Sequence, residues 1–265
     1  MAPAVVVRAN GSRTTRDALL AQLREAGLDA RATALSPVGI VLPSVGRLED
    51  VYGYAEGLWQ VQDEAAQLVG IYGAIPESAR VLDTCAAPGG KACHEAETHE
   101  VVATDLHAPK LRKIEAESRR LGLTARLRTL AHDATVPFPE SLGEFHAFMV
   151  DAPCSGLGTL RRHPELRYRR KPEDIPRIAA LQRRILENCQ EQVPPGGLLL
   201  YAVCTTEAEE GQDQVEMFLR SHPEWTAEPP VLPGLKLPLA QAYLRTLPGP
   251  EGFDGFFAAR LRKLY

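Results

Sequence analysis

Two cysteines in this chain each follow directly after an apolar run of residues. Cys154 stands in the segment Asp151-Ala152-Pro153-Cys154, and Cys204 stands in Tyr201-Ala202-Val203-Cys204-Thr205-Thr206. A third loop, Asp83-Thr84-Cys85-Ala86-Ala87-Pro88-Gly89-Gly90-Lys91, follows another apolar run. If the three runs are parallel strands of one sheet, their carboxyl ends deliver two thiols, two aspartates and a lysine to one crevice. This combination favours covalent chemistry on an electrophilic ring carbon.

The elements that must position these groups alternate regularly from residue 80 onward. The pattern predicts strands over 79–83, 100–105, 125–130, 145–151 and 197–203, and helices after Gly90 and over 110–121 and 175–192. Such alternation implies right-handed crossovers and a mostly parallel sheet that helices cover on both faces. A helix over 207–219 and a last strand over 256–261, antiparallel and at or near an edge, complete the expected α/β domain.

The first 60 residues have a different pattern. A short β-branched run at 5–9 is followed by helical spacing over 14–26, which Gly27 ends, and by a strand-rich stretch at 31–42. We therefore expect a small α+β lobe over 1–60 and a main domain over 61–265. Residues 1–7 predict a first strand and no signal peptide, because Arg8 interrupts the apolar run.

Composition limits the classes of partner. The hydrophobic fraction of 45% and the charged fraction of 24% are ordinary for a globular protein, and no run approaches the ~20 apolar residues that cross a membrane. Five cysteines without a Cys-x-x-Cys pair argue against a disulfide framework or a metal site. They indicate free thiols in a reducing compartment, the cytoplasm. With a net charge of -4, any contact with nucleic acid must come from a local patch.

The loop at 83–91 has the order of a nucleotide-binding turn: a strand end, small residues, two glycines and a helix. Gly89 and Gly90 let the backbone approach a ligand, and the helix that follows presents free amide donors. The loop is neither a Gly-x-Gly-x-x-Gly fingerprint nor a phosphate loop, so an ordinary turn explains it equally well. Asp105 ends the next strand, where such folds place an acid on ribose hydroxyls, although it could also cap the following helix.

Other candidate residues also have structural explanations. Asp133 follows the third strand and could bond an adenine edge, but it could equally be a turn aspartate. Cys154 lies next to a proline turn, and Cys204 could be a small buried hydrophobe. The remaining cysteines are interpreted as structural: Cys85, Cys93 and Cys189.

Residues 160–171 carry six Lys or Arg, one acid and one aromatic residue. Their cationic groups would neutralise phosphates, and the tyrosine could stack on a base. A charge run is more often a solvated face, but this one directly follows the Cys154 loop. The sequence therefore predicts RNA contact through Arg161, Arg162, His163, Arg167, Tyr168, Arg169 and Arg170.

Together these motifs resemble the Nop/Sun family of RNA cytosine-5 methyltransferases, over about residues 55–265 and with every main motif in order. Asp-x-Cys-Ala-Ala-Pro-Gly-Gly-Lys is highly specific for that family, and Asp-Ala-Pro-Cys-Ser-Gly and Tyr-x-x-Cys-Thr support it independently. The continuation Arg-Arg-His-Pro-Glu is most similar to the bacterial branch that modifies small-subunit ribosomal RNA. The resemblance implies a class I (Rossmann-like) methyltransferase fold with a seven-stranded sheet, and S-adenosyl-L-methionine as cofactor.

The resemblance also assigns roles by position. It implies a cofactor loop of Cys85, Ala86, Ala87, Pro88, Gly89, Gly90 and Lys91. Asp105 would hold the ribose, Asp133 would meet the adenine, and Asp151 would lie near the methionine part and the target base. Cys204 corresponds to the nucleophile and Cys154 to the cysteine that assists release of the methylated RNA. Lys91 and Asp151 complete the implied catalytic set.

The expected activity is methyl transfer to cytosine carbon 5 of small-subunit ribosomal RNA through a covalent cysteine adduct, by a monomer without a metal. The small lobe over 1–60 is expected to contact the RNA. A transfer RNA substrate, a different methyltransferase and a non-catalytic RNA-binding assembly factor remain alternatives. A mechanism like that of DNA cytosine methyltransferases would make Cys154 the nucleophile. Bacterial relatives often carry a helical RNA-binding domain ahead of this region, so a naturally short form or a fragment is expected here. Thr84 and the Ala92-Cys93 pair also depart from the commoner Leu and Thr-Thr, without an expected effect on cofactor binding.

Overall fold

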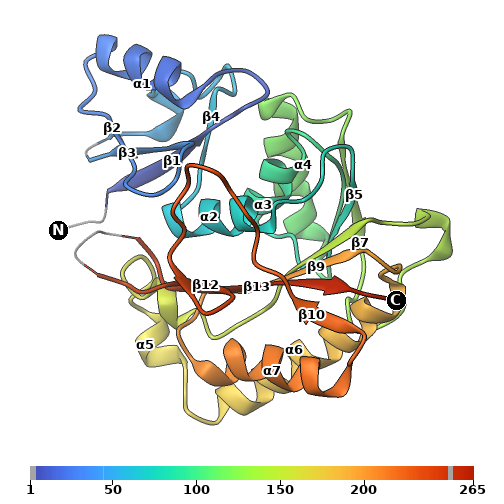
Figure 1. Cartoon of the computed structure of the whole chain (residues 1–265). Coiled ribbons are helices and arrows are strands. Elements are labelled where there is room, and N and C mark those ends of the chain that lie inside the picture. The colour runs from blue at the N-terminus through green and yellow to red at the C-terminus, as the bar shows by residue number, and fades with distance from the viewer. Residues whose placement is uncertain (1–3, 44, 250–252) are drawn as a thin grey trace.

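The computed structural model describes residues 4–43, 45–249 and 253–265. The chain forms a small lobe around a four-stranded sheet and a larger α/β domain around a second sheet (Figure 1). In Figure 1 the small lobe is blue and lies above the large sheet, beyond helix α2. Residues 1–3 and 44, which the sequence placed in the small lobe, lie outside the described residues.

The small lobe is an antiparallel sheet in the order β2-β3-β1-β4 with one helix. Its elements are β1 (Val5–Ala9), α1 (Arg16–Glu25), β2 (Arg31–Ala32), β3 (Gly39–Leu42), the short 3-10 turn η1 (Leu48–Asp50) and β4 (Trp59–Val61). The side chain of Thr15 caps α1 by accepting from the N–H of Ala18. The helix buries Leu19 and Leu23 against the sheet, as the helical spacing at 14–26 predicted.

A buried polar cluster joins the small lobe to the larger domain. Arg8 of β1 is 0% exposed and donates to Oε1 of Gln62 (2.7 Å) and of Gln60 (3.1 Å). It also forms an ion pair with Glu97, which follows the third helix. This cluster attaches the small lobe to the larger domain, which begins with α2 (Glu64–Gly73). Removal of one partner of such a buried ion pair would destabilise the protein strongly.

Five strands of the large sheet are parallel and end at one edge. They are β5 (Arg80–Asp83), β6 (Glu100–Asp105), β7 (Leu127–Ala131), β8 (Ala147–Asp151) and β9 (Leu198–Val203). The chain runs outward from β5 to β7 and then returns to β8, which pairs with β5 on its other side. Ligands of such sheets bind beyond the carboxyl ends of the strands at this point of reversal.

The α/β fold class is confirmed, but the sheet has nine strands in the described part of the chain instead of seven. Strand β13 (Phe256–Lys263) runs antiparallel to β9, as expected. Beyond it lie β10 (Trp225–Ala227), β11 (Leu239–Ala240) and β12 (Tyr243–Thr246), all antiparallel to their neighbours. Strands of two to four residues carry no readable alternation, which is why the sequence did not predict them.

Helices cover both faces of the large sheet (Figure 1). Helices α2, α3 (Gly90–Glu95) and α4 (Ala108–Leu121) pack on one face, and α6 (Asp174–Gln192) and α7 (Gln212–Ser221) pack on the other. The remaining short elements are η2 (Glu140–Leu142), η3 (Leu157–Thr159), α5 (Leu166–Arg169) and η4 (Ala208–Glu210). Within the described ranges, no helix combines the length and apolar character that a membrane span requires.

Candidate active site

A cavity of about 610 Å³ opens beyond the carboxyl ends of the parallel strands. The loops after β5, β6, β7, β8 and β9 all contribute to it, as the parallel arrangement of the strands requires. Its lining includes most of the candidate residues from the sequence: Cys85, Ala86, Ala87, Pro88, Gly90, Lys91, Asp105, Asp133, Asp151, Cys154 and Cys204. The structure therefore brings residues up to 119 positions apart in the chain into one site.

The loop after β5 is fastened to the strands on either side of it. The N–H of Thr84 donates to the carbonyl of Met149 in β8 (2.9 Å), and the N–H of Ala86 donates to that of Thr104 in β6 (2.8 Å). Gly89, which starts α3, has a φ of +107°, a conformation that favours glycine. A Cβ atom there would lie 3.0 Å from Cγ1 of Ile114 in α4, so the turn depends on that glycine.

Asp105 and Asp133 lie at the ends of β6 and β7 and line the cavity. One oxygen of Asp105 accepts the N–H of His107 (2.8 Å), which makes it part of the turn before α4. Asp133 accepts from both the N–H (2.9 Å) and the hydroxyl of Thr135 (2.8 Å). These hydrogen bonds, the backbone one first, lower the pKa of Asp133. Both residues thus have the turn role that the sequence left open, and both also face the cavity.

Lys91 and Asp151 form an ion pair in the middle of the site. Nζ of Lys91 donates to Oδ2 of Asp151 at 2.7 Å and lies 4.9 Å from the centre of the Phe256 ring. Lys91 is only 8% exposed. Burial by itself lowers the pKa of this lysine, but the charge of Asp151 and the hydrogen bond to it prevail, so the pKa is raised. The pair therefore keeps a cation next to the thiols.

Asp83 does not belong to the cavity lining, contrary to the expectation that two aspartates would meet the ligand. The side chain is 0% exposed, and neither carboxyl oxygen has a hydrogen-bond partner among the described residues. Burial, and after it the charge of Asp151, raises the pKa of Asp83 well above its ordinary value. Asp83 is the last residue of β5, and its buried carboxyl group lies outside the cavity lining.

The two cysteines of interest are in direct contact, with 3.2 Å between the Sγ atoms of Cys154 and Cys204. A hydrogen bond from the thiol of Cys154 lowers the pKa of Cys204; burial and Asp151 oppose this, and the charge of Lys91 adds to it. The same contact, together with burial, raises the pKa of Cys154 well above its ordinary value. The pair is asymmetric, because the pKa of Cys204 is lowered and that of Cys154 is raised.

The other three cysteines lack this activation. Burial raises the pKa of Cys93 and of Cys189 to about 12, and it raises that of Cys85 well above its ordinary value. Cys93 and Cys189 are core residues, as predicted, and Cys85 only lines the cavity. Among the described residues, no group of three or more His, Cys, Asp or Glu is arranged to hold a metal ion.

The basic segment at 160–171 contains exposed side chains and side chains that contact other residues of the protein. Arg167, Tyr168 and Arg169 of α5 are exposed, Tyr168 to 85%. Neither Arg167 nor Arg169 has an ion-pair partner in the part of the chain that the structure describes. His163 is exposed and lies 3.4 Å from a carboxylate oxygen of Glu165.

Three arginines of the basic segment contact other residues of the protein. Arg162 forms ion pairs with Asp63 and with Asp254 (3.1 Å to the latter), and Arg161 lies 3.7 Å from both carboxylates. Arg170 donates to the backbone carbonyls of Ser155 (2.8 Å) and Cys154 (3.3 Å). These three arginines thus have a structural role that the sequence did not reveal, and RNA contact by them stays a prediction.

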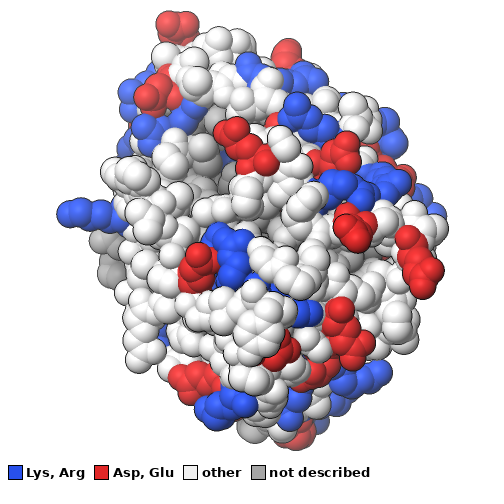
Figure 2. All heavy atoms as spheres, turned by 45° about the vertical axis from the view of Figure 1, so that its right-hand side comes forward, with Lys and Arg blue, Asp and Glu red and all other residues white. Residues whose placement is uncertain are grey.

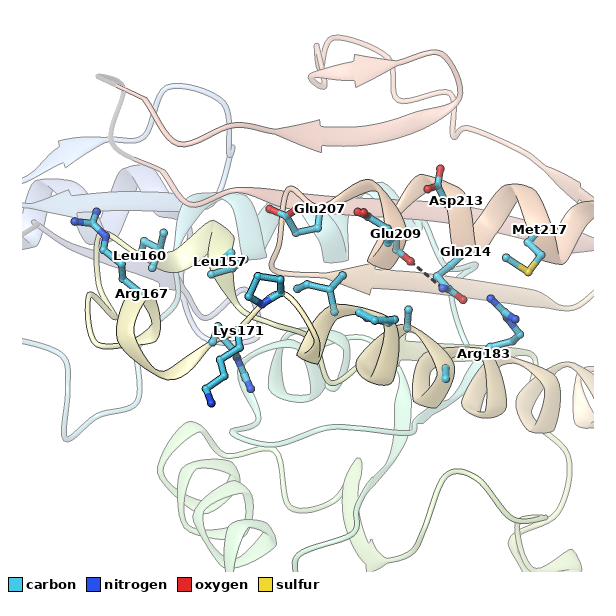
Figure 3. Close-up of a pocket in the computed structure, with 16 residues that line it drawn as sticks. Leu157, Leu160, Arg167, Lys171, Arg183, Glu207, Glu209, Asp213, Gln214 and Met217 are labelled. Atoms are coloured by element: carbon cyan, nitrogen blue, oxygen red, sulfur yellow. Dashed lines mark hydrogen bonds between the residues drawn. The ribbon is translucent and has the colours of Figure 1, made fainter.

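A second hollow of about 850 Å³ lies outside the cavity, between α6 and α7, and shares the segment after Cys154 with it. Figure 3 shows Glu207 and Glu209 on one wall, from η4 and its approach, and Lys171 and Arg183 on the opposite wall. Because acidic and basic side chains both line this hollow, its charge differs from that of a phosphate-binding site. Basic and acidic side chains are likewise interspersed on the face drawn in Figure 2.

Several residues that shape the site were missed from the sequence. Phe256 stands in a predicted strand, but nothing in the pattern places it over Lys91. Glu210 and Gln182 are buried polar residues that hold the Cys154 loop. Asp63 could have been recognised as the N-cap of α2, but its pairing with Arg162, 99 positions away, depends on tertiary structure alone.

Comparison with known proteins agrees with this geometry. A protein named ribosomal RNA small subunit methyltransferase B from Pseudomonas putida is 39% identical over 272 residues, which cover 99% of this chain and 60% of that protein. Its namesake from Vibrio cholerae is 36% identical over 263 residues, covering 97% and 58%. The chain therefore spans about 60% of the length of these curated relatives.

Solved structures share the fold. A methyltransferase homolog protein from Pyrococcus horikoshii has a TM-score of 0.84 at 25% identity, covering 100% of this chain and 88% of that one. The NSun6 protein of the same organism also has a TM-score of 0.84, at 19% identity, with coverage of 100% and 91%. At that identity the second comparison shows the fold alone.

Family descriptions match both parts of the chain. A ferredoxin-like domain of RsmF/B-like methyltransferases matches residues 1–49. The description "16S rRNA methyltransferase RsmB/F" matches residues 74–262, which include every candidate residue of the cavity. The resemblance inferred from the motifs is thereby confirmed, and the chain belongs to the RsmB/F family of 16S rRNA methyltransferases.

Proposed function

We propose that this chain transfers a methyl group from S-adenosylmethionine to carbon 5 of a cytosine in small-subunit ribosomal RNA. The observation that carries the proposal is the asymmetric thiol pair, 3.2 Å between sulfurs, at a cavity that the cofactor loop also lines. Methyl transfer to an exocyclic nitrogen requires no thiol. Carbon 5 of cytosine, in contrast, becomes nucleophilic only when a nucleophile adds to carbon 6.

The cavity suits S-adenosylmethionine by the chemistry of its lining. Carboxylates at Asp105 and Asp133 could accept from ribose hydroxyls and from the adenine amino group, and the backbone at Gly90 is open to close approach. When bound, the cofactor supplies an electrophilic methyl group. Its carboxylate and amine would lie toward the loop of 85–91, whose Lys91 is already paired with Asp151.

The thiolate of Cys204 would form the first bond, to carbon 6 of the cytosine ring. The electron pair of the ring double bond then moves to carbon 5, which takes the methyl group. Asp151 is placed to share a proton with ring nitrogen 3 and so to offset the negative charge on the ring, and Lys91 orients Asp151 through the 2.7 Å contact. The cytidine must be single-stranded or flipped out of its helix to reach these groups.

Release requires two further events: a base removes the proton from carbon 5, and the bond between Cys204 and carbon 6 breaks. Cys154 is placed next to that bond by its contact with the sulfur of Cys204. The contact with Cys204 and burial raise the pKa of Cys154, which favours the protonated form of this thiol over the thiolate that a first nucleophile requires. This asymmetry supports Cys204 as the nucleophile and Cys154 as the residue for release.

Contact with RNA is assigned to two surfaces. The exposed side chains of Arg167, Tyr168 and Arg169 can bind phosphates and stack on a base. We assign the lobe at 1–60 as the second surface; its support is that the ion pair of Arg8 with Glu97 attaches the lobe to the domain that carries the cavity. The names of the relatives support ribosomal RNA over transfer RNA.

The test is methylation of 16S ribosomal RNA, small subunits and transfer RNA by the purified chain with methyl-labelled S-adenosylmethionine, with bisulfite sequencing of the products. We expect 5-methylcytosine at a defined position of 16S RNA, none with Cys204→Ala, and with Cys154→Ala a protein–RNA conjugate that survives denaturing electrophoresis. Wild-type protein should form the same conjugate on RNA that contains 5-fluorocytidine. Methylation of another atom would refute the proposal, and a conjugate with Cys204→Ala but not with Cys154→Ala would reverse the two cysteines.

A further inference from the structure

Glu210 is a buried carboxylate that connects the two cysteine loops. It ends η4, six residues after Cys204, and its side chain is 0% exposed. Its Oε2 accepts the backbone N–H of Ser155, the residue after Cys154, at 2.8 Å. The same oxygen accepts from Nε2 of Gln182 in α6 at 3.1 Å. Glu210, which follows Cys204 in the chain, thus holds the loop that carries Cys154.

The remaining polar backbone groups of that loop are held from other elements. Nε2 of Gln182 also donates to the carbonyl of Pro153 (3.0 Å), and Arg170 donates to the carbonyls of Cys154 (3.3 Å) and Ser155 (2.8 Å). The hydroxyl of Ser155 donates to that of Thr205, next to Cys204 (3.0 Å). These contacts hold the backbone of the Cys154 loop and so help to set the separation of the two sulfur atoms.

A carboxylate in this position is unusual on energetic grounds. Glu210 has no ion-pair partner among the described residues, and its Oε1 has no hydrogen-bond partner there either. Burial of an unpaired carboxylate is costly. What its side chain supplies is an acceptor oxygen for the backbone amide beside Cys154.

We propose that Glu210 is a positioning residue that keeps the sulfur of Cys154 within reach of the bond at Cys204. It is therefore required for release of the methylated RNA and much less for methyl transfer itself. The expected effect on release rests on the proposed function. The expected effect on the position of the Cys154 loop does not.

The selectivity follows from what Glu210 does not touch. The backbone of Cys204 is fixed separately, because its carbonyl accepts the N–H of Gly158 (3.1 Å) at the end of β9. The hydroxyl of Tyr201 donates to the backbone carbonyl of Glu210 (2.6 Å), which holds η4 in place when the side chain is removed. Glu210 also does not line the cofactor cavity. Loss of its side chain should thus free Cys154 and leave Cys204 and the cofactor loop unchanged.

The experiment compares Glu210→Ala with the conservative Glu210→Gln, which keeps an acceptor oxygen for the N–H of Ser155. In Glu210→Ala we expect the first methyl transfer in a single turnover to stay near the wild-type rate. Steady-state turnover should fall by up to about tenfold, the ratio that corresponds to loss of one hydrogen bond of roughly 0.5–1.5 kcal/mol, with accumulation of the denaturation-resistant RNA conjugate. Glu210→Gln should restore turnover and remove the conjugate. Equal slowing of both steps without conjugate would show a merely structural role and overturn the proposal.

A second measurement needs no methyltransferase activity. In a Cys204→Ala background, the rate at which iodoacetamide alkylates Cys154 is followed by mass spectrometry with and without Glu210→Ala. We expect several-fold faster alkylation in the double variant and the parent rate in the Glu210→Gln counterpart; an unchanged rate in both overturns the positioning role. If wild-type protein transfers no methyl group, the proposed function fails while this measurement still decides the role of Glu210. Should Glu210→Ala not fold, Gln182→Met removes the bond to Pro153 and must give the same two readouts.

Discussion

Replacement of Gly89 by alanine tests whether the cofactor loop depends on the backbone geometry of this turn. At a φ of +107° an L side chain is strained, which costs roughly 1–2 kcal/mol. The added Cβ would also lie 3.0 Å from Cγ1 of Ile114, a fully buried side chain of α4 that cannot move freely. Crowding of this kind costs about 1–3 kcal/mol. We therefore expect Gly89→Ala to lower the free energy of unfolding by about 2–5 kcal/mol.

The neighbouring Gly90 is the matched control. It is not in the left-handed region, and the nearest atom to an added Cβ is Nε2 of Gln62, at the ordinary distance of 3.7 Å. Alanine is favoured over glycine by about 0.5–1 kcal/mol in the middle of a helix, and Gly90 is the first residue of α3. Gly90→Ala should therefore keep or slightly raise stability. Because Gly90 lines the cavity, the same change should weaken binding of S-adenosylmethionine.

Urea denaturation followed by circular dichroism measures the stability of wild type and both variants, and calorimetry measures cofactor affinity. A lower midpoint with an unchanged slope for Gly89→Ala identifies a loss of stability rather than a change in the denatured state. If Gly89→Ala unfolds at the wild-type midpoint, the turn tolerates a side chain and the reasoning from its φ and from Ile114 is wrong.

Three further outcomes are expected. Asp105→Ala should weaken binding of S-adenosylmethionine by about 1.5–3 kcal/mol, the worth of hydrogen bonds to a charged group, and unchanged calorimetric affinity would remove Asp105 from the site. Combined replacement of Arg167 and Arg169 by alanine should reduce the slope of log K for RNA binding against log salt concentration by about 1.4. Cofactor affinity should not change. An unchanged slope would mean that these side chains only face solvent. Cys154→Ala removes the hydrogen bond that lowers the pKa of Cys204, so the pH profile of Cys204 alkylation should move to higher pH. A profile that stays in place or moves to lower pH would contradict the assignment of the lowered pKa to Cys204.

The sequence was informative wherever one segment determined its own structure. Four of the five parallel strands are mostly buried apolar runs that end near a polar loop, as at Asp83 and Asp151, whereas β7 is only partly buried and was predicted from its place in the alternation. The carboxyl ends of such strands meet at one edge, so the approach of Cys154 to Cys204 also followed from order alone. The motif at 83–91 then identified the family, which the comparison confirmed.

The sequence was uninformative where a side chain has a partner from a distant segment. Arg162 belongs to a charge run, and its type predicts a phosphate contact. Only the fold brings Asp63 and Asp254 to its guanidinium. The short strands at 225–246 were missed for a related reason, because β13 supplies the pairing that holds them and their own residues show no alternation.

The chemistry of the thiol pair depends on the difference between two neighbouring environments rather than on either cysteine alone. Burial raises the pKa of both thiols, and at 3.2 Å two thiolates would repel each other strongly, so only one can be ionised. The cation of Lys91 lies on the side of Cys204 and favours its thiolate, whereas the buried carboxylate of Glu210 holds the loop of Cys154 and disfavours a negative charge there. An exchange of the roles of the two cysteines would therefore require a change in these flanking groups, which come from α3 and η4 and not from the two cysteines themselves.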